Sequence, residues 1–400
     1  MAGPLEGFTV VDLSAVVSGP LTGALLADQG AGVIKVERVG GGDIQRQVGS
    51  QRNGFSGFFH VLNRGKRSIA TDLGTEEGRR IVHALAARAD VVIQNFRPGV
   101  VERLGIGFDD LSAINAGLVY LSISGFGQTG PRSGDRAYDP IIQAYSGIGA
   151  VQGRIHRENP EMPEQVNMLL LDKLTAWTGC QAVTAALLAR SRTGKGQHIE
   201  LSMLDTAIAF IWSDTAADLI LQGEIDDPRP PVGASGSVHQ LADAWGVTMT
   251  LHQEEFVGFC RALGLADIPE DPRFASLQAR TRHRQELAAI LAERAAPAAA
   301  SLQVADAEAA MKREDVPFAR FRKLNELEDD PQVRHNGMLR RRHHPVAGEL
   351  QEARPAPLFT GTPLAMTAPA PVVGQHTREI LGELGLGAHY DDWLSRRVIA

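Results

Sequence analysis

One carboxylate in the chain has a setting suited to chemistry. Asp172 follows three leucines in LLLDKLTAW and precedes an amphipathic stretch that predicts a helix. The positive end of a helix keeps a nearby carboxylate ionised, and an ionised, partly desolvated carboxylate is a usable nucleophile. The local pattern favours a structural role as helix N-cap, which needs only a side-chain oxygen and is compatible with the chemical one. One geometry serves both roles, so the residues alone leave both interpretations open.

Several arginines lie where a parallel sheet would present them to an anion. Arg38 and Arg97 follow expected strands, and Arg103 and Arg136 lie in turns. Ligands of doubly wound sheets bind at the carboxyl ends of strands, and arginine suits bidentate phosphate binding. Each arginine taken singly also fits a solvated surface charge. The glycines 40–42 could cradle a phosphate or simply form a flexible turn.

Common catalytic motifs are missing. The first strand is followed by VSGPLTG and not by GxGxxG, and the chain contains no GxxxxGK[ST], HExxH or GxSxG. Dinucleotide, ATP, metalloprotease and α/β-hydrolase functions therefore have no motif support. The twelve histidines show no metal-ligand spacing. We expect no metal and no permanently bound cofactor.

The elements that must position these residues alternate between strand and helix. Apolar runs predict strands at 8–14, 32–37, 90–96 and 117–127. A helix is expected from Pro20 to the capping Gly30, and another after Thr75, whose first turn contains Glu76 and Glu77. A strand, a helix and a strand within about thirty residues form a βαβ unit. The pattern predicts a Rossmann-like, doubly wound α/β domain.

The rest of the chain predicts a second domain and a returning tail. We expect a turn-rich segment at 128–171, a helix at 173–192, a strand at 197–203 and a helix at 205–221. The Pro- and Gly-rich, acidic stretch 223–238 is the best linker. We expect a smaller α+β domain at 226–334 and a large domain built from 1–225 and 335–400. The amphipathic tail 372–387 is expected to dock on the large domain.

Composition limits the function class. The chain has 400 residues, a net charge of −7 and 44% hydrophobic residues, as an ordinary globular enzyme does. A mildly acidic chain argues against a nucleic-acid partner. No apolar run is long enough to span a membrane, and we expect no signal peptide. Two cysteines, Cys180 and Cys260, cannot form a disulfide framework, so we expect buried thiols and a cytoplasmic location.

Six segments of the chain resemble one enzyme family. They are LSAVVSGPLTGALLADQGAGVIKVERVGGGD, LNRGKRSIATDL, NFRPGVVERLGIGFDDL, SGFGQTGP, RTGKGQHIELSMLD and GQHTREILGELGL. Together they resemble the class III CoA-transferases, the family of formyl-CoA and carnitine CoA-transferases. The resemblance implies an interlocked-ring homodimer and places the family's nucleophile at Asp172. Acyl-CoA and a free carboxylic acid are the implied partners.

The resemblance also implies where coenzyme A (CoA) would be bound. The pair after the first strand falls on Val17 and Ser18, and Arg38 would meet the adenine or its phosphate. A turn and the segment lining the pantetheine and thioester would supply further contacts. The remaining implied CoA-binding residues are Thr71, Asp72, Leu73, Gly74, Asn95, Phe96, Arg97, Arg103, Arg136, Ala137, Tyr138 and Asp139.

Three departures from the family pattern bear on function. Oxalate-using members begin the first pair with Gln, where this chain has Val17, so oxalate is a poor candidate. The active-site lid is reduced to VGASGS at 232–237. The α-methylacyl-CoA racemases of the same family have His where this chain has Tyr138. Proton exchange needs a group whose pKa lies near the working pH. The reference pKa is ~6.5 for His and ~10 for Tyr, so Tyr138 argues against racemisation and for transfer.

The resemblance therefore predicts transfer of CoA from an acyl-CoA to a carboxylic acid through aspartyl anhydride and aspartyl-CoA thioester intermediates at Asp172. Two alternatives remain open at this point. One is α-methylacyl-CoA racemisation, and the other is a non-catalytic CoA-binding member of the family.

Overall fold

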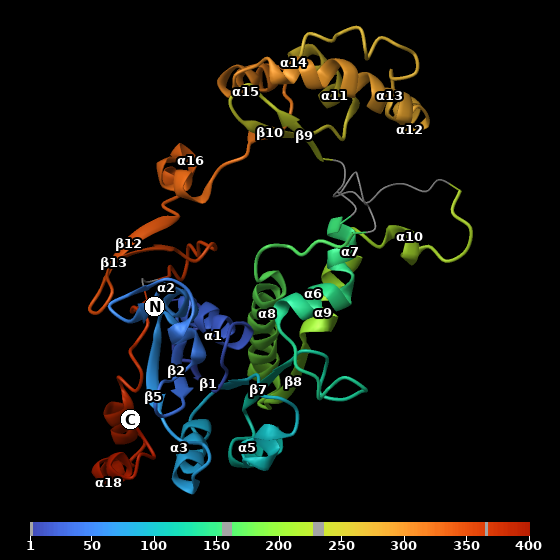
Figure 1. Ribbon diagram of the computed structural model, residues 1–400. Coiled ribbons are helices and arrows are strands. Elements are labelled where there is room, and N and C mark those ends of the chain that lie inside the picture. The colour runs from blue at the N-terminus through green and yellow to red at the C-terminus, as the bar shows by residue number, and fades with distance from the viewer. Residues whose placement is uncertain (1–2, 154–161, 227–235, 365–366) are drawn as a thin grey trace. The chain divides into compact units, whose positions relative to one another are not determined.

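The protein is described from a computed structural model, which covers residues 3–153, 162–226, 236–364 and 367–400 (Figure 1). The chain divides into two compact units, Met1–Ile211 with His335–Ala400 and Trp212–Arg334. The second boundary lies at 334/335, where it was expected. The first boundary lies at 211/212 and not at the expected 225/226. The predicted helix 205–221 is wrong in part, because helix α9 ends at Trp212 and a separate short helix, α10, follows.

A six-stranded, fully parallel sheet forms the centre of the first unit. The strand order is β5-β2-β1-β6-β7-β8, so the chain leaves the centre in one direction and then in the other. This is the doubly wound order, and its switch point lies between β1 and β6. The strands are β1 Thr9–Asp12, β2 Gly32–Glu37, β5 Lys66–Ala70, β6 Val91–Gln94, β7 Val119–Ser124 and β8 Gln197–Ser202.

Both faces of the centre of this sheet are covered, which is why the central strands β1, β6 and β7 are mostly apolar. Successive side chains point to opposite faces: Val10 belongs to one buried cluster and Val11 to the other. Helices α1 and α8 cover the Val10 face, and helices α3, α5 and α17 cover the Val11 face. The helices of this unit are α1 Ser18–Asp28, α2 Gly57–Asn63, α3 Glu76–Ala86, α4 Val100–Arg103, α5 Phe108–Ile114, α6 Asp139–Ser146, α7 Ile148–Gly153, α8 Leu170–Thr193, α9 Met203–Trp212, α17 Thr377–Glu383 and α18 Tyr390–Ser395.

Local signals in the sequence account for several of these elements. Thr75 caps α3 through a hydrogen bond from the Gly78 N–H at 3.0 Å, as predicted. The tail helix α17 docks on the sheet, with Ile380 and Leu381 fully buried in the same cluster as strand residues of β1, β2 and β5. The turn-rich segment expected at 128–171 is wrong in part, because α6 and α7 form within it.

Two antiparallel hairpins complete the first unit, β3 Gln51–Arg52 with β4 Phe55–Ser56 and β12 Leu339–His344 with β13 Gly348–Ala353. The short helix α16 (Pro331–His335) lies at the boundary between the units.

The second unit has its own core and an antiparallel sheet of order β11-β10-β9. Its strands are β9 Gly236–Gln240, β10 Trp245–Met249 and β11 Phe318–Arg320, and its helices are α10 Ala217–Ile220, α11 Gln253–Ala262, α12 Leu277–Arg282, α13 Arg284–Ile290, α14 Ala296–Ala300 and α15 Val304–Arg313. Of the expected lid 232–237, only Gly236 and Ser237 are described, and both belong to β9. The rest of that segment lies outside the described residues. No helix among the described residues is long and apolar enough to span a membrane.

Candidate active site

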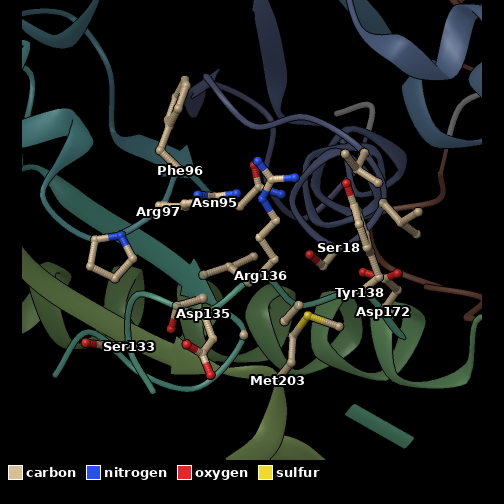
Figure 2. Close-up of a pocket in the computed structure, with 17 residues that line it drawn as sticks. Ser18, Asn95, Phe96, Arg97, Ser133, Asp135, Arg136, Tyr138, Asp172 and Met203 are labelled. Carbon is tan, nitrogen blue, oxygen red and sulfur yellow. The ribbon is translucent and has the colours of Figure 1, made fainter. Parts of the chain in front are cut away.

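A pocket of about 430 Å³ opens at the carboxyl edge of the sheet, at the switch point between β1 and β6 (Figure 2). Loops after β1, β6 and β7 line it, together with the first turn of α8. Figure 2 shows Ser18, Tyr138 and Asp172 at one end of the pocket and Ser133 and Asp135 at the other. Of the predicted site residues, those lining this pocket are Val17, Ser18, Asn95, Phe96, Arg97, Arg136, Ala137, Tyr138 and Asp172.

The prediction that Asp172 is the N-cap of its helix is wrong. Asp172 is the third residue of α8, and the N-cap is Leu169, which has no side-chain capping bond. Asp139 takes the capping role instead: its Oδ2 accepts the backbone N–H of Leu171 at 2.5 Å and of Asp172 at 2.9 Å. Because another residue satisfies these orphan N–H groups, the Asp172 carboxylate does not have to satisfy them.

Asp139 itself does not line the pocket. It is fully buried at the start of α6, and its Oδ1 accepts a hydrogen bond from Gln143 Nε2 at 2.6 Å. The Gln143 amide in turn bonds to the backbone of Val166 and Met168, just before α8. The adjoining loop approaches β7 closely, because a Cβ at Gly125 would lie 2.3 Å from that of Ala137. Asp139 and Gln143 thus position the start of α8.

Close packing of α1 against α8 brings Ser18 to Asp172. A Cβ at Gly179 would lie 3.1 Å from Thr22 Oγ1, so glycine permits the two helices to approach. The Thr22 hydroxyl donates to the Ser18 carbonyl at 2.8 Å and contacts the Ala176 carbonyl at 3.3 Å. The N-terminal turns of both helices therefore lie beside the Asp172 carboxylate, where their dipoles favour negative charge.

Burial works against that negative charge. Asp172 is only 7% exposed. Desolvation and then repulsion by the Asp139 carboxylate raise the pKa of Asp172 to about 6, although hydrogen bonds from the Ser18 backbone N–H and hydroxyl lower it. With this pKa, Asp172 is ionised at neutral pH, but its ionised form is less favourable than that of an exposed aspartate.

The loop that presents Val17 and Ser18 is held in an unusual backbone conformation. Val16 has a φ of 70°, in the left-handed region that a β-branched side chain disfavours. Asn95 bonds both backbone groups of Ala15, at 2.9 and 2.7 Å, and Asp43 accepts the Val16 N–H at 3.3 Å. Buried Lys35 pairs with Asp43 at 3.1 Å and donates to the Ser14 carbonyl at 2.9 Å. These contacts offset the local strain.

A second pocket of about 720 Å³ shares Phe96 with the first. It contains five more of the predicted residues, Arg38 and Thr71 to Gly74, with further apolar side chains that include Ile44 and Leu104. A guanidinium group beside an apolar surface suits a phosphorylated purine. The two pockets together could accept a long ligand with a polar, anionic end and a reactive end at Asp172.

Two predicted residues, Asp139 and Arg103, line neither pocket, and Arg397 lines the second pocket although it was not predicted. Arg103 is exposed, in α4, and lines neither pocket. Arg397 lines the second pocket, although it lies far along the chain from the other lining residues. No local signal predicts this, because it depends on how the tail docks. Within the described ranges, no group of three or more His, Cys, Asp or Glu is arranged to hold a metal ion.

Comparison with known proteins gives the family. CoA-transferase family III matches residues 5–377. The chain is 33% identical over 389 residues to the succinyl-CoA:glutarate CoA-transferase of Mus musculus, covering 95% of this chain and 86% of that protein. It is 34% identical over 395 residues to the succinyl-CoA–D-citramalate CoA-transferase of Chloroflexus aurantiacus, covering 97% and 96%. A crystal structure of a CAIB/BAIF family protein from Brucella suis superposes with a TM-score of 0.81 at 32% identity, covering 96% of this chain and 100% of that one. The chain therefore belongs to CoA-transferase family III and is an enzyme of the CoA-transferase type.

Proposed function

We propose that the enzyme transfers CoA between carboxylic acids through covalent intermediates on Asp172. The observation that carries the proposal is that Asp172 is a buried carboxylate whose helix is capped by another residue, in a pocket adjoining one suited to a nucleotide. The carboxylate is free to attack, and burial makes it a stronger nucleophile than a hydrated one.

The reaction begins when an Asp172 oxygen attacks the thioester carbonyl of the bound acyl-CoA. The C–S bond breaks, CoA leaves as a thiolate that stays bound, and an acyl-aspartyl anhydride remains. The thiolate then attacks the aspartyl carbonyl, which releases the donor acid as a carboxylate and leaves an aspartyl-CoA thioester. No proton is consumed in either step, and bound thiolate benefits from proximity.

The acceptor acid completes the cycle by the same steps in reverse order. Its carboxylate attacks the aspartyl thioester, expels the thiolate and forms a second anhydride. The thiolate then attacks the acceptor's acyl carbonyl, so that acyl-CoA departs and Asp172 is again a carboxylate. A carboxylate nucleophile suits this exchange, because an anhydride and a thioester both retain the acyl activation.

We further propose that the acids carry a second carboxylate. Arg97 and Arg136 line the same pocket as Asp172, and Figure 2 shows the Arg136 side chain reaching across it toward Asn95. Arginine can bind a distal carboxylate in a bidentate fashion. The relatives named above act on succinyl-CoA with glutarate or D-citramalate, which supports succinyl-CoA and dicarboxylic acids of four or five carbons as first candidates.

Intact-protein mass spectrometry after mixing the enzyme with succinyl-CoA tests the mechanism. We expect a CoA-sized adduct on the wild-type protein, which hydroxylamine removes, and none on Asp172→Asn. Asp135→Asn is a matched control, because Asp135 lines the same pocket but is exposed and pairs with Arg132 at 2.8 Å. The adduct should persist in that variant. An adduct that survives in Asp172→Asn would contradict the role of Asp172.

The residue at position 138 bears on the racemase alternative. Tyr138 lines the pocket near Asp172 and is 62% exposed. Solvent deuterium should not enter the α-carbon of a 2-methylacyl-CoA incubated with the enzyme, and its incorporation at a rate comparable to transfer would favour racemisation.

We also propose that the chain forms the interlocked homodimer implied by the family. Trp177 and Leu188 on α8 and Ile208 on α9 are exposed apolar side chains, which an interface would cover. Light scattering coupled to size-exclusion chromatography should give twice the chain mass, and a monomer would contradict this proposal.

A further inference from the structure

The last residues of the sequence reach the pocket that the nucleotide end of CoA would occupy. Ile399 forms a β-bridge with Thr71, and the Val398 carbonyl accepts the Asp72 N–H at 2.8 Å and the Thr71 hydroxyl at 3.1 Å. Val398 and Ile399 are buried in the cluster that covers the sheet. The backbone that follows Arg397 is thus anchored, and Arg397 lines the same pocket as residues 71–74.

The charge of this pocket favours an anion. Glu37 pairs with Arg46 at 2.6 Å and Asp43 pairs with Lys35 at 3.1 Å, so these lining carboxylates are neutralised within the protein. Asp72 is the remaining lining carboxylate, and its Oδ1 accepts the Gly74 N–H.

Two arginines, Arg38 and Arg397, line the same pocket as this carboxylate. Arg38 donates through Nε to the Gly42 carbonyl at 3.0 Å and has no carboxylate partner among the described residues. Arg397 has neither a hydrogen-bond nor an ion-pair partner for its side chain in the part of the chain that the structure describes. An exposed pair of arginines at one pocket is a typical phosphate site.

The backbone conformation of Arg397 is set by the end of α18. Its φ is 57°, in the left-handed region, at the position that follows the C-cap Arg396. The Arg397 N–H bonds the Leu394 carbonyl at 3.0 Å and the Val398 N–H bonds the Trp393 carbonyl at 2.9 Å, the Schellman pattern of a helix end. Glycine would adopt this backbone at Arg397 without steric cost. The side chain of Arg396 differs from that of Arg397, because it pairs with Glu77 at 2.5 Å and with Asp392 at 3.3 Å and does not line the pocket.

We propose that Arg397 binds a phosphate group of CoA together with Arg38, so that the C-terminal segment supplies a substrate-binding residue. This inference rests on the proposed function, because it takes CoA as the ligand of the second pocket. The group bound is either the 3′-phosphate or the diphosphate, which share the same chemistry.

Titration calorimetry with CoA tests the proposal without requiring turnover. We expect Arg397→Gly to raise the Kd for CoA about tenfold, because one charge-assisted contact is lost. Its melting temperature should equal or exceed that of the wild type, because glycine adopts this backbone freely, and a merely structural arginine would lower it. Arg397→Lys should fall between the two, and Arg396→Ala is the matched control, with an unchanged Kd.

Truncated ligands identify the phosphate. If the deficit of Arg397→Gly disappears with 3′-dephospho-CoA, Arg397 binds the 3′-phosphate, and if it persists, Arg397 binds the diphosphate. Wild type and variant should bind pantetheine equally. A Kd for CoA within twofold of the wild type in Arg397→Gly would overturn the inference.

The same data separate the inference from the proposed mechanism. If wild type binds no CoA, both fail. If Arg397→Gly binds CoA weakly while no aspartyl adduct forms in the wild type, the inference stands and the mechanism fails.

Discussion

The Asp139 carboxylate accepts the backbone N–H of Asp172 at 2.9 Å, across thirty-three positions of sequence. The two carboxylates lie close together but have different surroundings. Asp139 is fully buried and occupied by hydrogen bonds from two helical N–H groups and from Gln143, while Asp172 faces the pocket. The cap fixes the first turn of α8, and its charge raises the pKa of the carboxylate that the turn presents.

The buried charge of Asp172 should cost stability. The pKa of Asp172 is about 6 in the folded protein and lies near 4 in an unfolded chain. Between these values the folded protein binds a proton that the unfolded chain has released, so stability falls as the pH rises from 4 to 7. Asp172→Asn should abolish transfer and raise the free energy of unfolding at pH 7.5 by up to about 3 kcal/mol.

Urea denaturation at pH 7.5 and pH 4 measures this effect. The gain from Asp172→Asn should shrink toward zero at pH 4, where the native carboxyl is protonated. Equal gains at both pH values would show that the burial of charge is not the cause.

Burial of Asp172, and after it the charge of Asp139, should set the acid limit of activity. We expect kcat/KM of the wild type to fall below about pH 6, as Asp172 becomes protonated and ceases to be a nucleophile. Asp139→Asn preserves the shape of the cap but removes the repulsion, so it should move this limb to lower pH. The maximum rate should not rise, because an amide nitrogen would face the donor Gln143 Nε2. A limb that stays in place or moves upward would contradict the assigned repulsion.

Asn95 should act on catalysis by fixing the loop before Ser18. Its amide bonds both backbone groups of Ala15, next to the strained Val16. Asn95→Ala should lower kcat and reduce stability by about 1 kcal/mol, the usual worth of such hydrogen bonds.

Asn115→Ala provides the comparison, measured by the same steady-state assay and denaturation curves. Asn115 Nδ2 bonds the carbonyls of Ala86 and Ala89 at 3.0 and 2.8 Å and lines neither pocket. It should lose similar stability and retain kcat. If both variants lose kcat equally, the effect of Asn95 is general and not one of positioning.

The buried Lys66 should be essential for stability. Its ammonium donates to Asp12 Oδ2 at 2.7 Å, to the Pro20 carbonyl at 2.7 Å and to Asn63 Oδ1 at 2.9 Å. Lys66→Met leaves these acceptors without their donor and should cost about 3–5 kcal/mol. Exposed Lys195→Met should change stability by less than about 0.5 kcal/mol. Thermal denaturation of both variants measures the difference, and a loss below 1 kcal/mol for Lys66→Met would contradict this role.

The sequence by itself determined the elements whose signals are local. The strand 32–37, the capped helix after Thr75 and the apolar face of the tail helix follow from β-branched runs, capping side chains and helical periodicity. The alternation of strands and helices indicated a parallel, doubly wound sheet, because a helix between two strands is the usual crossover connection of parallel neighbours. The family resemblance placed the nucleophile at Asp172, which stays a prediction, and named many of the residues that line the two pockets.

Only the tertiary structure decided which residue caps α8 and which residues meet at each pocket. An oxygen anywhere in the chain can satisfy an orphan N–H group, so local pattern favoured Asp172 where packing places Asp139. The local pattern also missed helices α6 and α7 within 128–171 and the interruption between α9 and α10. Arg397 reaches its pocket through backbone bonds from Val398 and Ile399 to Thr71 and Asp72, across more than three hundred residues. Such long-range placement leaves no trace in the spacing of neighbouring residues.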